Sequence, residues 1–282
     1  MNTRYLIALD GSALAEAALQ AVRQLARDTD DVHLLHVIPP FATPVGLEPE
    51  YHLVLHDRAR TYLQEVRERF RGLEGGDIVQ EGDAAPAIVQ TALKLSVNVI
   101  AMGTHARTAP ARWVMGSVAD AVVRTAGVPV LLLPKGAIVS KGGVKRILVA
   151  VDGTRRSAAI LDDIRPLAAA AGAQVALLHV VDDGKDPMPQ FADDITRLAR
   201  IEPERSLQRM ADALDEKGVA ATTAVAEGDP VKQILAAAKR LGAGMIAMAT
   251  HAPDGLERAI AGSVAEGVLR RASVPVLLRK VR

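Results

Sequence analysis

The hydrophobic positions of this chain follow two alternating patterns. Short apolar runs, typical of strands buried on both faces, alternate with segments whose apolar residues recur near the 3.6-residue period of an amphipathic helix. Such alternation predicts an α/β fold with a mainly parallel sheet covered on both faces by helices. In the first half the expected strands are residues 5–9, 32–38, 78–80, 97–102 and 128–133, and the expected helices are 12–25, 50–73, 83–95 and 116–126.

The second half of the chain repeats the first. Residues 97–133 align without a gap on residues 243–279 and share the blocks IAM, THA, GSVA and VPVLL. A repeat of this length is a duplicated domain rather than a solenoid unit. The sequence therefore predicts two tandem open-sheet domains, Rossmann-like and doubly wound with five strands each, at residues 1–139 and 140–282.

Composition and charge narrow the classes of function. The formal net charge is +1 and only 2% of the residues are aromatic, so we expect neither nucleic acid nor membrane as a partner. The chain has no cysteine, which excludes disulfides and thiolate metal sites. Asp10 interrupts the first apolar run, and no stretch approaches the roughly 18 to 20 apolar residues of a membrane span, so we expect a cytoplasmic protein.

Candidate chemistry gathers where the expected strands end. In an open doubly wound sheet, ligands bind beyond the carboxyl ends of the strands, where the strand order reverses. Asp10 follows the first strand and Gly103 the fourth, while Gly116 and Ser117 open the next helix. A helix start offers free N–H groups and the positive end of the dipole, and Arg107 adds charge in the same loop. These residues favour a nucleotide or another phosphorylated small molecule.

At these positions the sequence resembles the universal stress protein family in its tandem, two-domain form. The family pattern after the fourth strand is Gly-x2-Gly-x9-Gly-(Ser/Thr), and the first half reads Gly103, Ala106, Gly116 and Ser117 at those positions. Asp-Gly-Ser after the first strand, His-Val near the end of the second and Val-Pro-Val in the fifth extend the resemblance over essentially the whole chain.

The resemblance implies that the chain binds ATP, with or without Mg²⁺. In many members the aspartate after the first strand and the backbone of the valine in the second strand hold the adenosine, and the Gly-rich loop holds the phosphates. On this chain the implied cofactor-binding residues are Asp10, Val37, Met102, Gly103, Ala106, Arg107, Gly116, Ser117 and Val118, followed in the second half by Asp152, Val180, Gly262, Ser263 and Val264.

The resemblance also implies association through the fifth strands, here residues 128–133 and 274–278. In a tandem chain these strands can pair as an intramolecular pseudo-dimer, and a further homodimer stays open.

The sequence departs from the family pattern in both halves. The second glycine is Ala106 in the first half, whereas Ala249 and Ala252 replace two glycines in the second. If a replaced glycine had a positive φ, alanine would cost roughly 1–2 kcal/mol, or about tenfold in affinity. We therefore expect a working site in the first half and a degenerate one in the second.

Simpler structural roles compete with ligand binding at several positions. Asp10 and Asp152 can end a strand and cap the next helix, and Gly-Ser pairs often begin helices. His105 and His251 are better explained by structural hydrogen bonds than by catalysis. His52 and His56 have the spacing of metal ligands, but without a third ligand we interpret them as one helix face and expect no metal site.

Three functions remain open from sequence alone. The first is a stress-response regulatory protein that binds ATP and hydrolyses it slowly or not at all. The second is a scaffold of the same fold that binds a partner without nucleotide. The third is a phosphoryl- or adenylyl-transferring enzyme, which the absence of a Walker A lysine, a nucleophile elbow or an HExxH motif disfavours. No catalytic residue is assigned.

Overall fold

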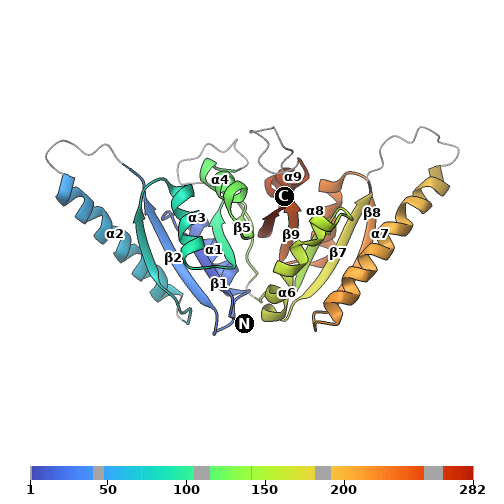
Figure 1. Ribbon diagram of the computed structural model, residues 1–282, viewed down its shortest axis with the longest axis horizontal. Coiled ribbons are helices and arrows are strands. Elements are labelled where there is room, and N and C mark those ends of the chain that lie inside the picture. Colours follow the sequence, from blue (N-terminus) through green and yellow to red (C-terminus); the bar gives the residue numbers. More distant parts are fainter. Residues whose placement is uncertain are drawn as a thin grey trace. The chain divides into compact units, whose positions relative to one another are not determined.

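The computed structural model describes residues 2–40, 48–70, 72–104, 115–140, 142–181, 192–250 and 263–281. Contacts between residues divide the chain into two compact units, Met1–Lys135 and Gly136–Arg282. Each unit is an α/β layer structure of the Rossmann-like kind that the apolar pattern predicts (Figure 1).

The first unit is built on a parallel sheet with the order β3-β2-β1-β4-β5. The chain runs toward one edge through β2 and β3, then crosses back to β4 on the other side of β1. Its elements are β1 (Arg4–Ala8), α1 (Ala13–Arg23), β2 (Asp31–Ile38), α2 (Glu48–Arg69), β3 (Asp77–Glu81), α3 (Ala84–Lys94), β4 (Val99–Gly103), α4 (Ser117–Thr125) and β5 (Val130–Leu133).

The second unit has the corresponding parallel order, β10-β9-β6-β7-β8. Where the first unit has one helix after its first strand, the second has two short consecutive ones, α5 and α6. Its elements are β6 (Arg146–Val151), α5 (Arg155–Ala158), α6 (Ile160–Ala171), β7 (Gln174–Val181), α7 (Ala192–Asp215), β8 (Ala221–Glu227), α8 (Pro230–Leu241), β9 (Met245–Thr250), α9 (Ser263–Arg271) and β10 (Val276–Lys280).

Helices cover both faces of each sheet. In the first unit α1 packs on β4 and β5 and α2 packs on β2 and β3, while α3 packs beside α4 (Figure 1). Because parallel crossovers are right-handed, connections running in opposite directions along the sheet place their helices on opposite faces. The strands are therefore buried on both sides, and Leu6, Ile7 and Ile100 of the central strands are fully buried.

Local sequence signals begin and end the helices. The Ser12 hydroxyl accepts a hydrogen bond from Ala15 N at 3.1 Å and caps α1, and the Asp229 carboxylate accepts from Lys232 N at 2.8 Å and caps α8. Gly172 and Gly242 end α6 and α8 in the left-handed conformation, with φ of 61° and 60°. Each unit thus carries a side-chain start signal, and the left-handed glycine stop signals lie in the second unit.

The Asp30 carboxylate holds the turn that leads into β2. It is only 1% exposed and accepts hydrogen bonds from Thr3 N at 2.8 Å and Arg27 N at 2.9 Å. We expect Asp30→Ala to lower the free energy of unfolding by about 2–4 kcal/mol, because the buried Thr3 N–H and the part-buried Arg27 N–H both lose a charged acceptor. Denaturant unfolding measures this, with the exposed Asp28→Ala as control at about 0.5 kcal/mol or less. Equal losses in both variants would contradict the prediction.

Candidate functional site

A crevice is expected in the first unit where the strand order reverses, between β1 and β4. These two strands are hydrogen-bonded neighbours, with Ala8 beside Met102 in the register. Asp10 follows β1 and Gly103 ends β4, so the fold brings both residues to the same edge of the sheet. This is the edge at which open α/β sheets bind ligands.

The Asp10 carboxylate has a structural role and remains exposed. Its Oδ1 accepts a hydrogen bond from Ser12 N at 2.9 Å, which closes the turn at Gly11, where φ is +78°. The residue is nevertheless exposed at the sheet edge. Both sequence interpretations of Asp10, ending the strand and facing a ligand, are therefore compatible with its position.

The backbone of Val37 faces the space beyond the end of β1. In a parallel ladder, the backbone groups of successive residues point alternately to the two neighbouring strands. Leu34 N donates to Gly76 O on the β3 side, whereas Leu35 O accepts from Leu9 N on the β1 side. Val37 is two residues after Leu35, so its backbone N–H and C=O groups also point to the β1 side. Because β1 has ended at this level, these groups of Val37 face the crevice.

His36 satisfies the last carbonyl of the β1 segment. Its Nδ1 lies 2.9 Å from Leu9 O and, as the protonated nitrogen, donates to it. Burial lowers the pKa of His36, with the Leu9 carbonyl and Asp10 opposing, so the ring is neutral at neutral pH. The ring also contacts Tyr62 edge-to-face, with 5.8 Å between centroids. Because the imidazole occupies Leu9 O, that carbonyl does not need the Val37 N–H as its donor.

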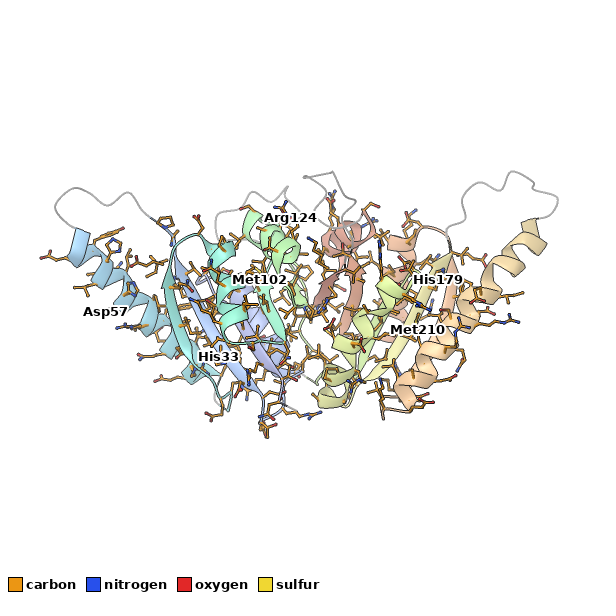
Figure 2. The ribbon with its side chains drawn as sticks, in the orientation of Figure 1. His33, Asp57, Met102, Arg124, His179 and Met210 are labelled. Atoms are coloured by element: carbon orange, nitrogen blue, oxygen red, sulfur yellow. The ribbon has the colours of Figure 1, made fainter. Side chains whose placement is uncertain are left out.

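Gly103 sits where α1 packs closely on the end of β4. A Cβ at this position would lie 3.1 Å from Leu14 Cγ and 3.4 Å from Ala15 N. A Cβ here would therefore require the Leu14 side chain or the start of α1 to shift by a few tenths of an ångström. Met102, the preceding residue, is only 6% exposed and contributes its side chain to the core (Figure 2).

Thr104 joins the end of β4 to the start of α4. Its hydroxyl donates to Leu133 O at 3.0 Å, and its own carbonyl accepts from Gly116 N at 2.6 Å. The loop that begins after Gly103 therefore returns to the strand end from which it left. Sequence reasoning missed Thr104, although THA is one of the blocks repeated in both halves.

The first turn of α4 begins at this edge with backbone N–H groups that no side chain caps. Gly116 is the N-cap, with φ −67° and ψ 154°, and supplies no side-chain cap. Ser117 is exposed and Val118 half-buried, so the first backbone N–H groups of the helix can serve an external acceptor. Asp120 lies in the same turn, and its charge is balanced by Arg124 at 3.1 Å (Figure 2).

The second unit places its corresponding residues at the same edge but binds its aspartate more tightly. Asp152 Oδ1 accepts from both Thr154 N at 2.9 Å and the Thr154 hydroxyl at 2.7 Å. Ser157 Oγ accepts from Asp152 N at 3.2 Å. Ala249 occupies the position of Gly103, inside β9 rather than at its end. The Asp152 turn is thus occupied by local hydrogen bonds.

Further members of the predicted second site are only partly described. Val180 lies in β7 beside Ala226 of β8, and Ser263 and Val264 begin α9. His179 precedes Val180 as His36 precedes Val37, and burial likewise lowers its pKa (Figure 2). Gly262, Ala106 and Arg107 lie outside the described residues, as do His105, Trp113, His251 and Ala252.

The sequence pattern of the Universal stress protein family matches residues 1–134 and 143–280. The chain belongs to this family. It carries two universal stress protein domains in tandem, as the repeat and the glycine pattern predicted.

Relatives match one domain or both. Universal stress protein YxiE of Bacillus subtilis is 32% identical over 143 residues, which is 47% of this chain and 97% of YxiE. Universal stress protein MJ0531 of Methanocaldococcus jannaschii is 32% identical over 139 residues, 48% of this chain and 82% of its own. A universal stress protein from Archaeoglobus fulgidus superposes with a TM-score of 0.73 at 23% identity, covering 99% of this chain and 96% of that one, which shows the shared tandem fold.

The two histidines of α2 in this universal stress protein meet a shared carboxylate. Glu81 Oε1 lies 3.1 Å from His52 Nδ1 and 2.7 Å from His56 Nε2, so the group joins α2 to the end of β3. Hydrogen bonds from His56 and His52 lower the pKa of Glu81. Sequence reasoning could not find Glu81, because it comes from a strand far along the chain. Among the described residues, no group of three His, Cys, Asp or Glu side chains is arranged to hold a metal ion.

A search of the described helices finds none that is long and apolar enough to span a membrane.

Proposed function

We propose that this universal stress protein binds an adenine nucleotide, ATP, in its first unit and acts as a stress-response regulator. The observation that carries the proposal is the grouping at one sheet edge of the Asp10 carboxylate, the outward-facing backbone of Val37 and the N-terminus of α4. A backbone N–H and C=O side by side match the acceptor and donor of the adenine edge. The first turn of α4 supplies donors and positive dipole for phosphate.

The nucleotide acts here as a conformational or stability ligand. Among the described residues near this edge, none forms a nucleophile–base pair with an orienting third group, so hydrolysis is slow or does not occur. A ligand that binds only the folded state stabilises it by an amount that grows with the logarithm of ligand concentration above Kd. In this proposal ATP binds as its complex with Mg²⁺, which is held by the phosphates. We place the protein in the cytoplasm, in keeping with a chain that has no cysteine.

The second unit is proposed not to bind ATP. Ala249 replaces Gly103, and Asp152 is held by Thr154 and by the Ser157 hydroxyl. A nucleotide that bound Asp152 through Oδ1 would compete with the N–H and hydroxyl of Thr154 for that oxygen. Affinity in the second unit is therefore expected to be at least about tenfold weaker than in the first.

Titration of Mg²⁺-ATP into the purified protein tests this proposal. Trp113 is the sole tryptophan and lies between Gly103 and Gly116 in the sequence, so its emission reports on the loop. Calorimetry gives the stoichiometry, and we expect one ATP per chain. Two ATP per chain would contradict the assignment of the second unit. No heat and no change in emission at millimolar ATP would overturn the proposal and favour the nucleotide-independent scaffold.

A further inference from the structure

The second unit has an open groove between its paired helices α5 and α6 on one side and α7 on the other. Its volume is about 290 Å³, which is the size of a small-molecule site. Leu161, Met210 and Leu214 supply its apolar surface, and Figure 2 labels Met210 on α7. The groove lies against helices on one face of the sheet and is separate from the carboxyl edge where ATP is proposed to bind.

In the first unit an ion pair ties the corresponding helices together, although a hollow of about 360 Å³ remains along α2 at Tyr62. The Arg69 guanidinium of α2 makes two hydrogen bonds to the Glu16 carboxylate of α1, at 2.8 and 3.0 Å. Burial raises the pKa of Tyr62, and the nearby Glu16 carboxylate raises it further. Leu19 beneath them is fully buried. A single carboxylate thus holds α1 and α2 together.

The buried residues of the long helices establish which positions correspond. Ala59, Leu63 and Val66 of α2 are buried with the same spacing as Leu207, Ala211 and Leu214 of α7. This register places Met210 at the position of Tyr62 and Lys217 at that of Arg69.

The turns after the first strands align the other side of the groove. Asp10-Gly-Ser corresponds to Asp152-Gly-Thr, which places Ala158 at the position of Glu16 and Leu161 at that of Leu19. Leu161 is half-buried and lines the groove, whereas Leu19 is covered.

With alanine at the position of Glu16, the cations of the groove lack the carboxylate that the first unit supplies. Within the part of the chain that the structure describes, neither Arg165 nor Lys217 makes a hydrogen bond or ion pair through its side chain, and Arg165 Nε is buried without a partner. Arg209 is paired with Glu202 at 3.0 Å, and Asp162 is the one carboxylate in the lining. The groove therefore has an apolar surface and an unbalanced positive rim.

We propose that this groove binds a small amphiphilic anion, a medium-chain carboxylate. The carboxylate of the ligand takes the place that Glu16 occupies in the first unit and pairs with Lys217 and Arg165. Its aliphatic chain lies on Leu161, Met210 and Leu214, where burial of apolar surface contributes about 25 cal/mol per Å². The binding does not require nucleotide, and it gives the second unit a ligand of its own.

Calorimetric titration with sodium octanoate tests the proposal on the full chain. Wild type is expected to bind one octanoate per chain, with 1-octanol at least tenfold weaker because it lacks the charge. Ala158→Glu places in the second unit the carboxylate that Glu16 supplies in the first, and it is expected to weaken octanoate binding at least tenfold. Lys217→Met keeps the apolar surface and is expected to weaken octanoate about tenfold while octanol is unchanged; it also covers the case in which Ala158→Glu fails to fold.

The reciprocal variant is Glu16→Ala in the first unit, which is expected to add a second octanoate site beside Arg69. An unchanged stoichiometry in this variant would count against the role given to the carboxylate. No binding by wild type at millimolar octanoate, or equal binding by wild type, Ala158→Glu and Lys217→Met, would overturn the proposal. Because ATP is titrated separately into the same proteins, a failure to bind nucleotide can be distinguished from a failure to bind octanoate in the groove.

Discussion

Gly116→Glu is expected to lower the affinity for ATP at least about 100-fold, equivalent to about 2.8 kcal/mol. The side chain places a carboxylate at the start of α4, where the proposed phosphates lie, and like charges at close range repel strongly in a crevice of low dielectric. Gly116 has a φ of −67°, which glutamate adopts without strain, so the helix and the fold are expected to persist. Calorimetric titration of ATP and circular dichroism of the variant measure both effects.

The repeat offers a matched control for this substitution. Gly262→Glu makes the same change at the corresponding position of the second half. Because the second unit is proposed not to bind ATP, this variant is expected to retain wild-type affinity and a stoichiometry of one. If Gly116→Glu bound ATP as tightly as wild type, the assignment of the site would be wrong. If both variants lost ATP affinity equally, nucleotide binding would depend on both units.

Gly75→Ala is expected to destabilise the first unit by more than about 3 kcal/mol. Gly75 has a φ of +141°, and a Cβ there would lie against backbone, nominally 2.2 Å from Val32 O and 2.6 Å from Val32 C. Neither atom can move aside, because Val32 N donates to Glu74 O and ties the two segments together at 2.7 Å. The contact and the disfavoured backbone conformation add, which places the change among the most damaging kind of point substitution.

Gly72→Ala separates the steric contact from the backbone conformation. Gly72 also has a positive φ, +88°, but nothing lies within 4 Å of its Cβ position. We expect a loss of only about 1–2 kcal/mol there, from the left-handed conformation alone. Denaturant unfolding of the two variants gives the comparison, and losses of equal size would contradict the steric argument at Gly75.

Much of the fold follows from local pattern. Apolar runs and helical periodicity predicted the alternation of strands and helices, and the internal repeat predicted two domains. Some expected bounds were wrong: the helix expected at 50–73 is α2, Glu48–Arg69. One break was also missed, because two helices, α5 and α6, follow β6 where the repeat predicted one. Thr154 caps the first of these through Ser157 N, and the second begins after only one intervening residue. Periodicity cannot detect such a break.

The candidate site was only partly readable from sequence. Asp10 and Gly116 were identified because aspartate after a strand and glycine before a helix are residue types with a definite physical use. Thr104 was not, because its role depends on the distant Leu133 carbonyl and on Gly116 N across the loop. His36 was quoted only as a neighbour of Val37, yet its bond to Leu9 O is what leaves the valine backbone facing the crevice.

The sequence by itself determined the duplicated α/β architecture and the family, and it led to the sheet edge proposed for the ligand, because these depend on periodicity, repeats and short motifs along the chain. Only the tertiary structure decided which groups meet. Glu81 joins His52 and His56 across two elements, and Glu16 joins Arg69 in one unit while Ala158 leaves Lys217 alone in the other. These pairings depend on how helices and strands from distant segments pack side by side, and no local sequence pattern reports which distant residues meet.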